Sequence, residues 1–108
     1  MPAPNPLRLY QQQAVRTASP AVLVDKLYGI GLAALQAGDA PRARRALVEL
    51  TASLDEERGG ELAQNLRGLY DFSLRAVNDG DLAVVTEILT GLRDAWREGV
   101  LARPAAAA

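Results

Sequence analysis

The sequence LYGIGLAALQAGD at residues 27–39 is followed, 42 positions later, by the related sequence LYDFSLRAVNDGD at residues 69–81. Both stretches begin with Leu-Tyr, carry a Leu and an Ala at matching positions, and end in Gly-Asp. The match continues at the same offset beyond these stretches, where Leu47 aligns with Leu89. The chain of 108 residues therefore contains one pattern twice.

Each copy is typical of a helix that ends in a tight turn and leads into a second helix. In the first copy, apolar residues recur at helical spacing over residues 23–34. Gly38 suits the left-handed position that ends many helices, and Asp39 suits the cap of the next one; Gly80 and Asp81 repeat this turn. One hairpin cannot cover its own apolar faces, so we expect the two to pack together. The prediction is an all-α fold, an antiparallel up-down four-helix bundle of two αα-hairpins with a short N-terminal helical segment.

The predicted boundaries make a single helical-bundle domain of residues 1–99. The expected segments are an extended or short helical N-terminal segment at 1–16, helices at 19–37, 40–54, 61–78 and 82–98, and a flexible tail at 100–108. Asp55 to Gly60 is predicted to be a polar loop. The side chains expected to face the core are Leu23, Leu27, Ile30 and Ala34, then Ala43, Ala46, Leu47, Leu50 and Leu54, then Leu62, Leu66, Leu69, Ser73 and Val77, and finally Leu82, Val85, Leu89, Leu92 and Trp96.

The composition excludes several classes of function. There is no Cys and no His, which removes disulfides, thiolate nucleophiles and zinc sites with sulfur or nitrogen ligands. The net charge of −1 and the lack of a Lys/Arg block argue against nucleic acid or an anionic membrane as a partner. No apolar run is long enough to span a membrane, and the start of the chain lacks the layout of a signal peptide, so we expect a cytoplasmic protein. We predict no catalytic residues, no metal site and no cofactor.

Three local features have two interpretations each. Gly29 and Gly31 lie inside a predicted helix, where glycine lowers stability, and either close helix approach or a groove for another chain would explain them. The basic residues at 42, 44 and 45 could meet a carboxylate, although a solvated face is the simpler interpretation. Tyr28 and Tyr70 each follow an inward Leu, so we expect them about 100° away on the edge of the core, with a half-buried ring and a hydrated hydroxyl group. Core packing and partner contact fit such a position equally well.

An ordered set of short motifs extends from about Tyr10 to Gly99 and resembles the FliS family, the flagellar export chaperones for flagellin. The run from GGELAQNL at 59–66 to LYDF at 69–72 is its most specific part. The other motifs, in chain order, are Thr17-Ala18-Ser19-Pro20, Leu23, Leu27-Tyr28, Ser53-Leu54-Asp55, Leu92-Arg93 and Ala95-Trp96. The resemblance implies a cytoplasmic bundle that holds the C-terminal segment of flagellin, keeps it unpolymerised and delivers it to the type III export gate. We expect a monomer or a weak homodimer.

The chain departs from the family pattern in length. The stretches on either side of the first turn, and the one before the second turn, each look short by roughly two helical turns. A loss of about seven residues rotates a helix by only about 20°, so the apolar stripe would still face inward while that end of the bundle becomes about 10 Å lower. We interpret this as a coordinated shortening that leaves less groove for a client.

A client helix would dock in a groove between helices, with apolar contacts at helical spacing. The candidate contacts for this role are Tyr10, Val24, Tyr28, Gly31, Tyr70 and Leu74. The segment around Tyr10 is expected to cover the same surface when no client is bound. Two alternatives remain: a FliS-like helical adaptor for another client or for self-association, and, more remotely, a small all-α enzyme of the chorismate mutase type.

Overall fold

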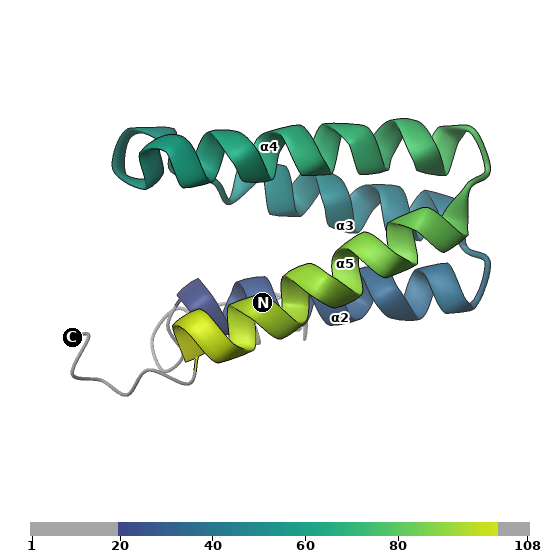
Figure 1. The fold of residues 1–108 in the computed structure, drawn as a ribbon. Helices are drawn as coiled ribbons and strands as arrows, with labels where there is room; N and C mark the ends of the chain where they lie inside the picture. Colours follow the sequence, from purple (N-terminus) through teal and green to yellow (C-terminus); the bar gives the residue numbers. More distant parts are fainter. Residues whose placement is uncertain (1–19, 102–108) are drawn as a thin grey trace, which may run out of the picture.

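The structure, a computed structural model, describes residues 20–101 as four α-helices and a short π-helical turn (Figure 1). The elements are α2 (Pro20–Gln36), α3 (Ala40–Ala52), α4 (Glu56–Asn78), α5 (Leu82–Trp96) and η1 (Arg97–Leu101). Within residues 20–101 there is no β-strand, and the all-α prediction is confirmed. The predicted N-terminal segment at 1–16, with Tyr10, and residues 102–108 of the predicted tail lie outside the described residues.

The helices pack as an antiparallel bundle in which α2 contacts α3 and α5, and α4 contacts the same two helices from the other side. Consequently α2 and α4 occupy diagonal positions. Both Gly-Asp turns lie at one end of the molecule, and the α3–α4 connection lies at the other (Figure 1). The two hairpins α2–α3 and α4–α5 are thus the two copies of the repeated pattern.

The Gly-Asp turns are built in the same way in both hairpins. Gly38 and Gly80 have φ angles of 70° and 82°, a left-handed conformation that glycine adopts without steric cost. The amide of Asp39 donates to the carbonyl oxygen of Ala34 at 2.8 Å. The amide of Asp81 donates in the same way to the carbonyl oxygen of Ala76 at 2.9 Å. Each Asp side chain then accepts a hydrogen bond from the first turn of the next helix. Local chemistry alone accounts for both turns.

The connection between α3 and α4 differs from the predicted loop. Asp55 accepts a hydrogen bond from the Arg58 amide at 3.2 Å and so caps a helical turn that begins at Glu56. Helical geometry breaks at Gly60 (φ 52°, ψ −130°), and the helix then continues to Asn78. The prediction of a loop over Asp55–Gly60 is therefore wrong for this turn, because its capping residue and acidic first positions favour a helix.

The core confirms the predicted inward faces of α3 and α5, and confirms those of α2 and α4 only in part. Ala43, Leu47 and Leu50 of α3 are fully buried, together with Val85 and Leu89 of α5. In the other two helices, by contrast, several large aliphatic side chains expected inside lie at the surface; these are Ile30, Leu62 and Leu69. The residues buried in those helices are Tyr28, Gly31, Ala34 and Leu35 in α2, and Ala63, Tyr70, Ser73, Ala76 and Val77 in α4. The inward faces of α2 and α4 are thus rotated only in part from the predicted ones, toward Tyr28 and Tyr70, because Ala34, Ser73 and Val77 are buried as predicted.

Candidate functional site

A pair of tyrosines at the centre of the bundle explains this rotation. Tyr28 and Tyr70 are 0% and 1% exposed, and their hydroxyl oxygens are 2.6 Å apart in a hydrogen bond that joins the diagonal helices α2 and α4. The ring centroids are 6.4 Å apart with the ring planes tilted by 55°. Burial raises the pKa of both hydroxyl groups, so both remain protonated at neutral pH. The prediction of half-buried rings with hydrated hydroxyl groups is wrong, because one hydroxyl group donates to the other inside the bundle in place of water.

Equivalent positions of the two copies meet in this pair. Tyr28 and Tyr70 are separated by the 42 positions of the repeat. Equivalent residues of two like units contact one another only near the symmetry axis that relates the units, so the pair lies near the axis between the two hairpins. Next to Tyr28, the small residue Gly31 lies close to α3 and α5: a Cβ atom there would come within 3.2 Å of Leu89 and 3.4 Å of Ala46. Close helix approach is therefore the role of Gly31 in the bundle.

The remaining predicted contacts lie in two different places. Val24 is partly exposed and lines a pocket at the end of the bundle, whereas Leu74 is partly buried against the core. Tyr28, Gly31 and Tyr70 are buried, so in this conformation they present no surface to another protein. The five predicted residues in the described part of the chain thus do not form one surface. Three of the large apolar side chains that do reach the surface, Ile30, Leu62 and Leu69, are ones that the sequence places in the core.

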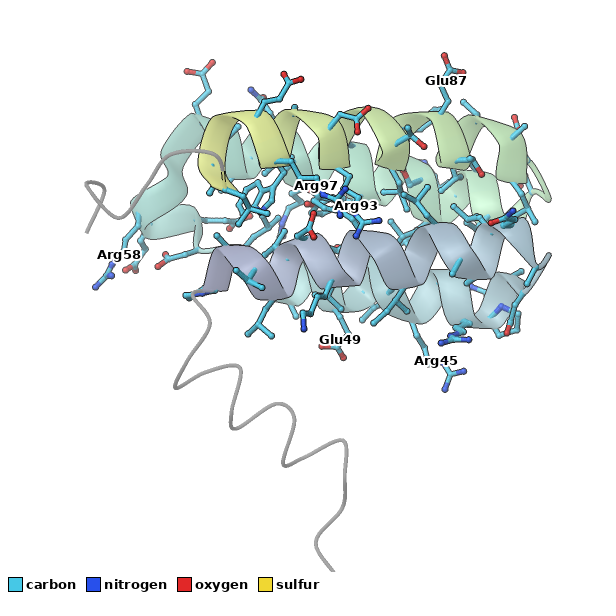
Figure 2. The ribbon with its side chains drawn as sticks, turned by 90° about the horizontal axis from the view of Figure 1, so that it is seen from below. Arg45, Glu49, Arg58, Glu87, Arg93 and Arg97 are labelled. Atoms are coloured by element: carbon cyan, nitrogen blue, oxygen red, sulfur yellow. The ribbon has the colours of Figure 1, made fainter. Side chains whose placement is uncertain are left out.

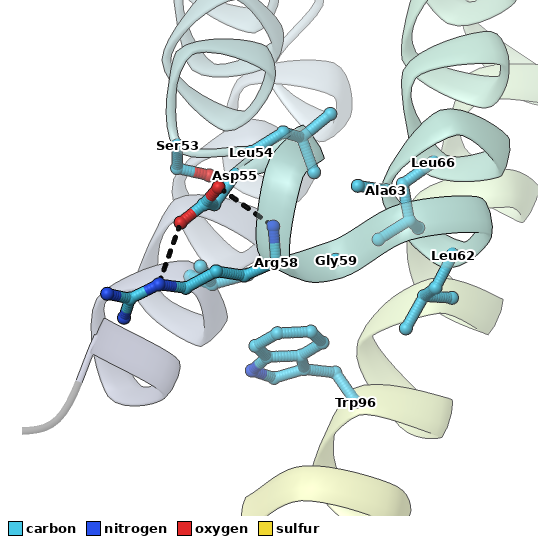
Figure 3. A pocket seen from close by; sticks show the side chains of 10 residues that line it. Ser53, Leu54, Asp55, Arg58, Gly59, Leu62, Ala63, Leu66 and Trp96 are labelled. Carbon is cyan, nitrogen blue, oxygen red and sulfur yellow. Dashed lines mark hydrogen bonds and ion pairs between the residues drawn. The ribbon is translucent and has the colours of Figure 1, made fainter.

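The end pocket, of about 280 Å³, lies between the start of α2, the α3–α4 connection and the end of α5 (Figure 3). Its apolar lining comprises Val24, Leu54, Leu62, Ala63, Leu66 and Trp96. On its polar side, Asp55 and Arg58 form an exposed ion pair of 3.8 Å. A mostly apolar hollow with a polar edge suits the end of an amphipathic segment.

An apolar stripe on α4 continues from this pocket. It consists of Leu62, Leu69 and Phe72, which are 63%, 38% and 46% exposed. Their spacing of seven and three residues places them on one side of the helix. Contiguous apolar side chains at the surface of a small protein are typical of interaction sites. The pocket and the α4 stripe together form the best candidate for a protein-binding surface in the described part of the chain.

Polar contacts hold the end of α5 against the start of α2, at the pocket. The Trp96 indole Nε1 donates to the carbonyl oxygen of Ala21 at 2.8 Å, and the Trp96 ring packs edge-on against Tyr28 with centroids 6.5 Å apart. Asp25 accepts hydrogen bonds from Arg97 at 2.8 Å and from Arg93 at 3.2 Å. Figure 2 shows both arginines turned toward α2, whereas Glu87 points into solvent. These contacts give the pocket a defined wall.

The hydrogen bonds from Arg97 and Arg93 lower the pKa of Asp25 from 3.8 to about 2. A carboxyl group with a lower pKa in the folded state stabilises the fold above its unfolded pKa, and this stabilisation disappears as the pH falls from about 4 to about 2. We therefore expect Asp25→Asn to lower the free energy of unfolding at pH 7 by about 1–2 kcal/mol, and to narrow this difference toward pH 2. Urea unfolding at several pH values measures both effects. The exposed Asp71→Asn is the control, and an equal loss in both variants would contradict the prediction.

Two further features of residues 20–101 concern metal ions and membranes. Among residues 20–101, no group of three or more acidic residues is arranged to hold a metal ion. No helix in the same part of the chain is long and apolar enough to cross a membrane. The ordered, largely buried polar contacts are those that tie helices together, as described above for Tyr28, Asp25 and Trp96.

Comparison with known proteins agrees with this architecture. The family model described as "Flagellar protein FliS" matches residues 3–103. The flagellar secretion chaperone FliS of Salmonella typhimurium is 31% identical over an alignment 109 positions long. The alignment covers 81% of this chain and 81% of the relative. The protein of the same name from Bacillus subtilis is 30% identical over 115 residues, covering 89% and 86%. No solved structure gives a significant match. With a family match over nearly its whole length and a four-helix bundle as its fold, the chain belongs to the FliS family of flagellar secretion chaperones, which are not enzymes.

Proposed function

We propose that this protein binds the C-terminal segment of flagellin in the cytoplasm, prevents its premature polymerisation and delivers it to the type III export gate. The observation that supports the proposal is the exposed α4 stripe beside the end pocket, in a chain of the FliS family. An apolar, helix-prone segment that is unfolded before assembly would lay one face along the stripe. The segment loses conformational entropy on binding, so a large apolar contact area is needed to offset that loss.

The Tyr28–Tyr70 hydrogen bond supports the same proposal from inside the bundle. Because these two rings fill the centre, Leu62 and Leu69 are left on the outside of α4. Exposed leucines lower solubility unless a partner covers them. A bundle that buries its two central tyrosines and leaves Leu62 and Leu69 exposed is suited to holding a second apolar chain.

Isothermal titration with the C-terminal segment of flagellin from the same organism tests the proposal. We expect saturable binding with a negative heat-capacity change, the mark of apolar burial. The alternative function, a FliS-like helical adaptor for another client, predicts no binding to any flagellin C-terminal segment. Size-exclusion chromatography with light scattering would test the expected monomer or weak homodimer in the same samples.

The N-terminal segment is proposed to compete with the client. It carries apolar residues, including Tyr10, and no core of its own, and it precedes α2, whose start forms part of the pocket. If this segment covers the surface when no client is bound, deletion of residues 1–16 raises the affinity for flagellin, because the client no longer displaces it. Titration of the shortened chain measures this. Unchanged or weaker binding would contradict the competition.

A further inference from the structure

A second groove, of about 500 Å³, runs along the outer face of α2, away from the α4 stripe. We name it the α2 groove; it is lined by Lys26, Gly29, Ile30 and Ala33 of α2, Arg42 of α3 and Arg93 of α5. Its lining contains cations from three helices and no carboxylate. In a chain whose net charge is −1, this is a local excess of positive charge. The lining of the groove is therefore positive in a chain of slightly negative net charge.

The Arg93 side chain is held in place before any partner arrives. Its Nε and Nη2 atoms donate to the two carboxylate oxygens of Asp25, at 3.2 and 3.4 Å. The guanidinium group also lies over Gly29, where a Cβ atom would come within 2.9 Å of Arg93 Nη2. Gly29 thus makes room for this cation. Because Asp25 also binds Arg97, Arg93 shares this carboxylate with a second guanidinium group.

The basic cluster predicted from the sequence separates into different roles in the structure. Arg44 donates to the side chain of Asn78 at 2.9 Å and so links α3 to α4. Arg45 points into solvent (Figure 2). Of the three clustered arginines, Arg42 alone lines the α2 groove, where it joins Lys26 and Arg93. Beside them Ile30 is 42% exposed, which adds an apolar contact between the cations.

We infer that the α2 groove is a docking site for an acidic segment of a second protein, one whose carboxylates pair with Lys26, Arg42 and Arg93 and whose apolar side chain covers Ile30. Complementary charges of this kind orient a partner and raise its association rate. Since α2 and α4 are diagonal in the bundle, a partner in this groove leaves the α4 stripe accessible. The inference concerns a different surface from the proposed function and does not depend on the client's being flagellin.

An acidic protein segment fits the groove better than an anionic membrane does. A membrane-binding face is broad, with basic residues around several large apolar side chains. Here the surface is hollowed, Ile30 is its one large apolar side chain, and the net negative charge of the whole chain opposes approach to an anionic bilayer.

Fluorescence anisotropy with a designed probe tests the inference. The probe is a fluorescein-labelled, alanine-based helical peptide with glutamates one helical turn apart and a single central leucine. We expect saturable binding to the full-length protein that weakens as salt is raised, because exposed charges are screened. A peptide with lysines in place of the glutamates is expected not to bind.

Two charge-reversal variants with the same net charge separate the groove from general electrostatics. Lys26→Glu/Arg42→Glu is expected to weaken probe binding about tenfold and to bind the lysine peptide instead. Arg45→Glu/Arg75→Glu, which reverses exposed cations outside the groove, changes the affinity by less than about twofold. Circular dichroism confirms that both variants fold. The inference is overturned if the wild-type protein does not bind the probe, if both variants lose equal affinity, or if only phosphatidylserine vesicles bind through Lys26 and Arg42.

Discussion

Replacing two apolar side chains of the α4 stripe with charged ones, in the variant Leu62→Asp/Phe72→Asp, is expected to weaken the binding of the flagellin C-terminal segment by at least about 100-fold. Burying a large apolar side chain stabilises a complex by about 1.5–3 kcal/mol, and two such contacts correspond to about two or more orders of magnitude in affinity. Both side chains are exposed in the free protein, so the loss arises in the complex and not in the fold. Isothermal titration of wild type and variant against the same peptide gives the ratio.

Val48→Asp is the matched control for this experiment. Val48 lies on α3 and is 50% exposed, so the substitution introduces the same side chain, once instead of twice, at a comparably exposed apolar position outside the stripe. We expect its affinity to stay within about twofold of wild type, and its thermal unfolding to match that of the double variant. Equal losses in Val48→Asp and in the double variant would mean that the stripe is not the docking surface.

The second large effect is expected inside the bundle. Replacing one of the two central tyrosines with Phe should lower the free energy of unfolding more than replacing both. Tyr28→Phe leaves the Tyr70 hydroxyl group buried without its partner, which costs about 1–3 kcal/mol of unfolding free energy, and Tyr70→Phe has the same effect on Tyr28. The double variant removes both hydroxyl groups and leaves two rings of nearly the same shape. We expect it to lie within about 1 kcal/mol of wild type.

Urea unfolding of the four proteins forms a double-mutant cycle that measures this coupling directly. The control is Phe72→Leu, which changes an aromatic ring on the surface of α4 and is expected to alter stability by less than about 0.5 kcal/mol. If the losses of the two single variants add in the double variant, the hydroxyl groups do not depend on one another, and the explanation for the rotated faces of α2 and α4 is wrong.

The parts of the fold that could be predicted are those in which each residue contacts residues close to it in the sequence. Gly38 and Asp39 meet residues at most five positions away, and so do Gly80 and Asp81, so their turns follow from local geometry. The inward face of α3 was equally clear, because its apolar residues form one narrow stripe on an otherwise charged helix. Asp55 has the same capping role, and the missed helical turn after it could have been found from the Asp-Glu-Glu pattern.

The candidate surface could not be predicted in the same way, because α2 and α4 carry apolar residues around more than half of their circumference. Periodicity then allows several inward faces, and the leucines were the obvious choice. What decides between them is whether each tyrosine hydroxyl group finds a partner, and that partner is 42 positions away on the diagonal helix. The role of Gly29 depends likewise on Arg93, a residue of another helix.

By itself, the sequence determined that this protein is a bundle of two like hairpins, since caps, turns and apolar spacing act within a few residues. Only the tertiary structure decided which side chains of α2 and α4 are hidden, because that choice depends on polar groups that meet across the bundle. The exposed α4 stripe and the cationic α2 groove are both consequences of that choice.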